Sequence, residues 1–181
     1  MEKRNTATDA AALIIPGVGS NRDRHPKLQR FMLANDSVTI AVEVPIWLSE
    51  DDIAALEDKY GVTIVPREPL DPASPDAGHK PRHITGHIDF LQARNGAIHI
   101  LDYKPDARTN KPIAQLTIYA LALTRLVPSL RLFDIKCAWF NETCYNEFFP
   151  RKLLPAVLQC RNKSDKNGWF ISDSYRLCLY P

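Results

Sequence analysis

The dipeptide Asn95-Gly96 constrains this chain more than any other feature, because it stands between two apolar runs. Asn-Gly is the preferred pair for a type I′ turn, in which both central residues need φ > 0, so the sequence predicts a β-hairpin with this pair at its tip. Pairing residues outward from the tip sets Asp89 directly opposite Asp102. The turn chemistry therefore predicts two like charges side by side on one face of a sheet.

An arrangement of this kind needs a compensating partner. Like charges at opposed positions destabilise a sheet by roughly 0.2–1 kcal/mol, whereas a divalent cation between them converts the repulsion into ligation. Carboxylate oxygens suit Mg²⁺ or Mn²⁺. Lys104 follows Asp102 at a spacing of two, so strand alternation directs its ammonium to the same face. Two carboxylates and a lysine on one face predict phosphoryl chemistry.

The rest of the chain predicts an α/β domain. Its 181 residues, 45% of them hydrophobic, suit a single domain over 1–181. Five prolines make 66–82 a loop, and Asn110-Lys111-Pro112 begins a core helix with an apolar stripe. We expect a central mixed β-sheet with that core helix and flanking helices. Strands are predicted at 38–47, 86–94, 97–104, 130–140 and 143–149, with a tight turn at 141–142, and helices at 25–33, 50–60, 113–127 and 151–161.

The ordered set of motifs resembles the PD-(D/E)XK nuclease superfamily, and within it the RecB-like branch. The resemblance covers roughly residues 38–127 and implies a restriction-endonuclease-like core. The residues that carry it are Glu43 on a strand, Gly86-His87-Ile88-Asp89, Asp102-Tyr103-Lys104, and Gln115 with Tyr119 on the following helix.

This resemblance implies a ligand set for one or two Mg²⁺ or Mn²⁺ ions. Asp89, Asp102 and the backbone carbonyl of Tyr103 bind the metal, and Glu43 on its strand with His25 upstream complete the shell. Lys104 then holds or helps to deprotonate the attacking water, or stabilises the charge that develops on the phosphate. Asp89, Asp102, Lys104 and Glu43 are the expected catalytic residues.

Further residues are expected to meet the substrate. Gln115 and Tyr119 stand at i and i+4, so they share a helix face and can border the site. His87 lies on the same strand face as Asp89, while Arg108 and Lys111 follow the motif and can meet phosphates. A group of basic residues upstream can also contact phosphates; it consists of Arg22, Arg24, Lys27 and Arg30. These residues predict a DNA-hydrolysing enzyme, with single- or double-stranded substrate and exo- or endonuclease action left open.

Other readings of the same residues stay open. The fold can serve as a catalytically inactive nucleic-acid-binding or assembly module, or as a metal-dependent enzyme for small molecules. The acids and Lys104 can form an ordinary solvated hairpin face, and His83, His87 and His99 can suggest zinc or non-haem iron. A solvated face does not explain why apolar residues, Ile98 and Ile100, share the side of Asp102.

Composition bounds the setting. A net charge of +2 permits a nucleic-acid partner without requiring one. No apolar run reaches the ~20 residues of a membrane span, so we expect a cytoplasmic protein without membrane partners, alone or in a repair, phage or defence assembly. The spacing of the four cysteines indicates reduced thiols rather than an iron–sulfur cluster; they are Cys137, Cys144, Cys160 and Cys178.

Overall fold

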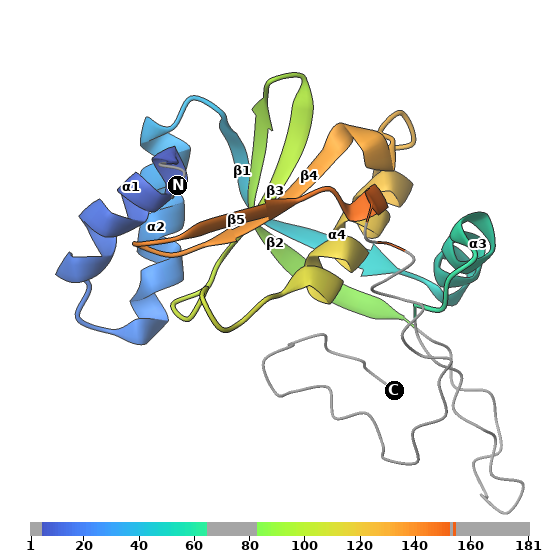
Figure 1. The fold of residues 1–181 in the computed structure, drawn as a ribbon, viewed down its shortest axis with the longest axis horizontal. Helices are drawn as coiled ribbons and strands as arrows, with labels where there is room; N and C mark the ends of the chain where they lie inside the picture. Colours follow the sequence, from blue (N-terminus) through green and yellow to red (C-terminus); the bar gives the residue numbers. More distant parts are fainter. Residues whose placement is uncertain (1–4, 65–82, 153, 155–181) are drawn as a thin grey trace, which may run out of the picture.

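A five-stranded sheet forms the centre of the chain in the computed structural model, which describes residues 5–64, 83–152 and 154 (Figure 1). The strands follow one another across the sheet in chain order. They are β1 (Thr39–Leu48), β2 (Ile84–Arg94), β3 (Ala97–Tyr103), β4 (Ile135–Phe140) and β5 (Tyr145–Phe148). The helical segments are α1 (Thr6–Ile14), η1 (Ile15–Gly17), α2 (Asn21–Asn35), α3 (Glu50–Tyr60), α4 (Ile113–Leu126) and η2 (Leu132–Asp134).

The sheet is mixed because β3 and β4 run parallel while the other neighbouring pairs are antiparallel. The parallel pair needs a crossover connection, and α4 provides it (Figure 1). The predicted α/β class, with a mixed sheet, a core helix and flanking helices in a restriction-endonuclease-like arrangement, is confirmed.

Two apolar clusters hold helices against the sheet. One cluster joins α3 and α4 to the strands, and ten consecutive residues of α4, Gln115–Thr124, are buried. The other cluster joins α1 and α2 to Phe90, Leu101, Tyr103 and Phe140. Since β3 contributes to both clusters, its alternate residues are buried on both sides, and Asp102 lies in a strand with little access to water.

The central hairpin forms as predicted. Asn95 and Gly96 have φ of 52° and 71°, the left-handed values that a type I′ turn needs at both positions. The register runs outward from Arg94 opposite Ala97 to Phe90 opposite Leu101. Helix α3 also matches its prediction, with a capping box at Ser49 and the C-cap at Gly61, whose φ is 63°.

Three predicted boundaries are wrong for local reasons. Helix α2 begins at Asn21 rather than at residue 25, because the Ser20 hydroxyl accepts the Arg22 N–H and caps the helix, which leaves Pro26 inside it. The fourth strand begins at Ile135 because the chain just before it forms η2. The predicted tight turn at 141–142 is a four-residue loop, in which the Asn141 side chain accepts the N–H groups of residues 143 and 144.

Some predictions fall outside the described residues. These are the loop at 66–82, most of the helix at 151–161, and two of the four cysteines, Cys160 and Cys178. Of the other two, Cys137 is buried, Cys144 is half-buried, and both are free thiols. No helix in the described ranges combines the length and the apolar character needed to cross a membrane.

Candidate metal centre

Asp89 and Asp102 lie one step beyond the last described pair of the β2–β3 ladder, Phe90 opposite Leu101. There a side chain joins the two strands, because the Tyr103 N–H donates to Asp89 Oδ2 at 3.2 Å. Asp102 is 5% exposed and the Asp89 side chain 16% exposed. The structure thus brings the two predicted acids together in a nearly buried position.

The pKa values of the two carboxyl groups are shifted in opposite directions. Burial raises the pKa of Asp102 well above its usual range, and the neighbouring charge of Asp89 raises it further. Burial also acts on Asp89, but hydrogen bonds from His25 and Asp102 outweigh it and lower the pKa of Asp89. Asp102 therefore takes up a proton more readily than Asp89 does.

Lys104 forms an ion pair with Asp102. Its Nζ is 3.1 Å from Asp102 Oδ2, and its side chain is largely buried. Burial alone would lower the pKa of Lys104, but the charges of Asp102 and Asp89 outweigh it and raise that pKa. Lys104 is therefore a cation at neutral pH. Among the described residues, Asp102 Oδ2 accepts no well-directed hydrogen bond and has only this ion pair.

His25 reaches the acids from α2. Its Nε2 lies 3.0 Å from the Tyr103 carbonyl oxygen and 3.4 Å from Asp89 Oδ2, and its ring meets the Tyr103 ring edge-on. The hydrogen bond to Asp89 raises the pKa of His25 against the opposing effect of burial. The structure thus gathers His25, Asp89 and the Tyr103 carbonyl, three of the groups expected to bind metal.

These donors fit a hard divalent cation. His25 contacts both Asp89 and the Tyr103 carbonyl, and the neighbouring Asp102 has one buried carboxylate oxygen without a directed hydrogen bond. No three His, Cys, Asp or Glu side chains in the described ranges are grouped closely enough to hold an ion by themselves. The predicted side-chain ligands Asp89, Asp102, Glu43 and His25 therefore do not form a closed cluster in this arrangement, and His25 contacts only Asp89 among them.

Glu43 lies on β1 between two residues with regular partners. Val42 pairs with Phe90 and Val44 with Ile88, so Glu43 stands across from Asp89. Its φ is 50°, a left-handed value for a residue other than glycine in a strand. Its side chain is exposed and accepts a hydrogen bond from Gln29 Nε2 on α2. Gln29 is not among the residues predicted from the sequence, although it stands four residues after His25 on a predicted helix.

Gln115 and Tyr119 form a hydrogen-bonded pair on α4. Gln115 Nε2 donates to the Tyr119 hydroxyl at 2.9 Å, and both side chains are buried. Burial raises the pKa of Tyr119, and the charges of Asp102 and Asp89 add to that shift, so the phenol lies near the acids and keeps its proton. The hydroxyl also sits over Gly86, where an added Cβ would be 2.8 Å away.

That close approach yields a prediction for Gly86→Ala. The added methyl group overlaps a buried, hydrogen-bonded hydroxyl, so we expect a loss of about 1–3 kcal/mol in the free energy of unfolding. Urea unfolding measures it. Tyr119→Phe removes the overlapping oxygen, so the cost of Gly86→Ala should be smaller in the Tyr119→Phe background. Equal costs in both backgrounds would contradict the contact.

The structure leaves three predicted substrate residues on the surface. His87 is exposed on β2 opposite Pro45, and Arg108 and Lys111 are exposed in the segment between β3 and α4. Their roles stay predictions. The alternative metal site at His83, His87 and His99 does not form among the described residues. His99 is instead buried beside Arg94, whose Nε donates to it, and burial lowers the pKa of His99 to about 4.

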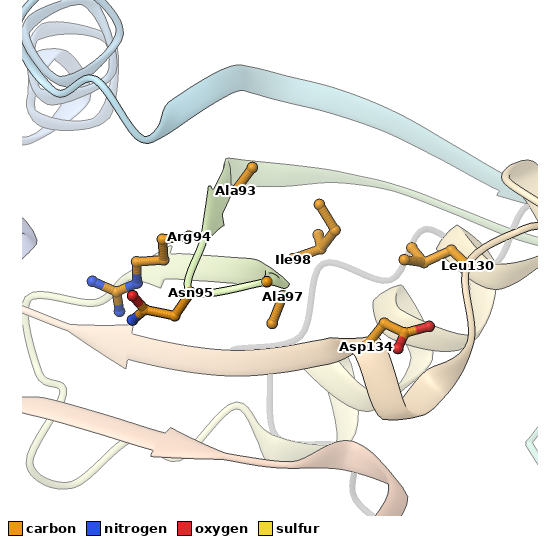
Figure 2. A pocket seen from close by; sticks show the side chains of 8 residues that line it. Ala93, Arg94, Asn95, Ala97, Ile98, Leu130 and Asp134 are labelled. Carbon is orange, nitrogen blue, oxygen red and sulfur yellow. The ribbon is translucent and has the colours of Figure 1, made fainter.

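A separate hollow lies at the hairpin tip, at the other end of β2 and β3 from the acids (Figure 2). Its lining comes from the turn and from the segment before β4, and it includes none of the predicted site residues. The lining residues are Ala93, Arg94, Asn95, Gly96, Ala97, Ile98, Leu130 and Asp134. The hollow is therefore distinct from the candidate metal centre.

The mixed sheet with helices on both faces, and the acid pair beside a lysine, define the class of a restriction-endonuclease-like nuclease fold. The family model of the PD-(D/E)XK nuclease superfamily matches residues 10–149, a range that includes every predicted site residue. The chain belongs to the PD-(D/E)XK nuclease superfamily. Members of this superfamily are generally nucleases that use Mg²⁺ or Mn²⁺, which implies a nucleic-acid substrate. The comparison with curated proteins gives no match.

Proposed function

We propose that the chain is a deoxyribonuclease of the RecB-like branch that depends on Mg²⁺ or Mn²⁺ and hydrolyses DNA phosphodiester bonds. The observation that carries the proposal is the nearly buried pair Asp89 and Asp102, with Lys104 Nζ 3.1 Å from Asp102. Opposed buried acids are costly in a metal-free sheet, so their presence supports a site built for a cation.

Five groups would hold one or two ions: the carboxylates of Asp89, Asp102 and Glu43, the Tyr103 carbonyl and His25 Nε2. A bound Mg²⁺ or Mn²⁺ supplies an acidified water and positive charge at the phosphate. Protons compete with a cation for His25 and Asp102, because the pKa of each is raised. Metal binding should therefore strengthen as the pH rises.

Lys104 contributes charge rather than a free base in this proposal. Its raised pKa keeps it protonated, which supports holding the attacking water or meeting the negative charge that develops on the phosphate, and disfavours proton removal by a neutral amine. Tyr119 adds a donor: because Gln115 Nε2 donates to its oxygen, the phenolic hydrogen is available to a phosphate oxygen. His87, Arg108 and Lys111 are proposed to contact the DNA backbone.

A cleavage assay tests the proposal. We expect the purified chain to cut DNA in Mg²⁺ or Mn²⁺ and to stop in EDTA, with Asp89→Ala inactive under all conditions. Linear and circular DNA, each single- and double-stranded, separate exonuclease from endonuclease action, and RNA and free nucleotides test for other substrates. Metal-independent binding without cutting would favour the inactive assembly module instead. The cytoplasmic location and the repair, phage or defence assembly stay predictions.

A further inference from the structure

The backbone of β1 has two irregular points, a register shift between Thr39 and Ala41 and a left-handed residue at Glu43. The φ of Glu43, 50°, lies in the left-handed region, which a glutamate adopts only when the surrounding structure imposes it. The residues on either side of Glu43 keep regular antiparallel pairing with β2. The left-handed residue is therefore the one that stands across from Asp89.

The side chain that meets Glu43 comes from α2. Gln29 is 4% exposed, and its Nε2 donates to Glu43 Oε1, whereas Glu43 itself is exposed and could be hydrated by water. The contact is thus not needed to satisfy Glu43. Its effect is to restrict an otherwise free carboxylate, because a buried amide fixes the position of one of its oxygens and leaves the other available.

Gln29 also shares a helix face with His25. The two residues stand four apart on α2, and His25 contacts Asp89 and the Tyr103 carbonyl. One face of α2 therefore makes two separate contacts with the candidate metal centre, one through each side chain. The two contacts join α2 to Glu43 on β1 and to Asp89 and Tyr103 on β2 and β3.

We propose that Gln29 is a positioning residue, which holds the Glu43 carboxylate at the left-handed residue of β1 so that the carboxylate faces the acid pair. This inference rests on the proposed function, because it assigns Gln29 an effect on metal binding. Removing a residue that hydrogen-bonds to a metal ligand typically lowers metal affinity or activity by about 10–100-fold.

Gln29→Leu and Gln29→Met remove the amide donor and keep an apolar side chain of similar size. We expect each to weaken Mn²⁺ binding, measured by calorimetry without DNA, by about tenfold or more, with kcat lowered and KM for DNA unchanged. The free energy of unfolding in EDTA should change little, since Glu43 is exposed. Wild-type Mn²⁺ affinity in both variants, or a loss of stability that accounts for the whole effect, would overturn the inference.

An exchange variant separates positioning from packing. Gln29→Glu with Glu43→Gln keeps one amide and one carboxylate in contact but moves the charge from β1 to α2. We expect it to fold as stably as the wild type and to bind Mn²⁺ no better than Glu43→Gln alone. Restored Mn²⁺ affinity in the exchange variant would show that only the contact matters and would refute the assignment.

The behaviour of the wild-type chain distinguishes a failure of the proposed function from a failure of the role of Gln29. If the wild-type chain binds no Mn²⁺ and cuts no DNA, the proposed function and this inference fall together. If the wild-type chain does both and the Gln29 variants match it, only the inference falls.

Discussion

Asp102→Asn is expected to abolish metal-dependent DNA cleavage and, in metal-free protein at neutral pH, to make the fold more stable. The substitution removes a ligand oxygen and a negative charge from the candidate metal centre, so kcat should fall by roughly 10³-fold. An asparagine amide can donate a hydrogen bond toward Asp89, and Asp89 remains as a negative charge near Lys104.

The gain in stability should depend on pH in a definite direction. Because the pKa of Asp102 is raised in the folded chain, the folded state binds its proton more tightly than the unfolded state does. The stability that this group contributes is complete below the ordinary aspartate pKa of about 4 and is lost as the pH rises through the raised value. An asparagine has no proton to lose. The variant should therefore gain roughly 0.2–1 kcal/mol at neutral pH, the cost of opposed like charges, and the difference should shrink toward pH 4.

Urea unfolding in EDTA from pH 4 to pH 8 measures this difference, and the same preparations serve the cleavage assay. Asp58→Asn is the matched control, since Asp58 is an exposed acid on α3 and undergoes the same chemical change. A less stable Asp102→Asn at neutral pH would mean that the ionised carboxylate has a structural hydrogen-bonding role, and retained cleavage would refute the assignment of the site.

Local chemistry explains which parts of this molecule could be predicted from the sequence. Asn95-Gly96 sets a turn type, the turn type sets the register, and the register sets Asp89 beside Asp102, so each step depends on neighbouring residues only. The capping box at Ser49 and the apolar stripe of α4 are equally local. These features carry the fold class and the centre of the candidate site.

Contacts between distant elements could not be predicted in the same way. The left-handed φ of Glu43 has no signal in the sequence, because no glycine or asparagine marks the position. Gly86 belongs to the motif that carries the family resemblance, but the sequence does not show why a glycine is needed there. The reason is the Tyr119 hydroxyl, which α4 places where a Cβ of residue 86 would lie. The sequence thus predicts turns and strand register better than the contacts that helices make with the strands.

Lys104→Met should separate catalysis from metal binding. Lys104 is proposed to supply charge near the phosphate without coordinating the ion, so kcat should fall by on the order of 10²–10³-fold. Mn²⁺ affinity, measured by calorimetry, should be equal or higher, because the variant removes a positive charge 3.1 Å from Asp102 Oδ2. Asp102→Asn, by contrast, should lose both properties.

The matched control for that variant is Lys59→Met, which removes an exposed lysine from α3 and should leave kcat unchanged. Lys104→Arg keeps the charge but replaces a compact ammonium with a planar guanidinium, so it should recover only part of kcat. If Lys104→Met instead loses Mn²⁺ binding in proportion to kcat, then Lys104 acts by holding the Asp102 carboxylate in place. A charge acting directly on the phosphate predicts the opposite pattern, with the ion retained and turnover lost.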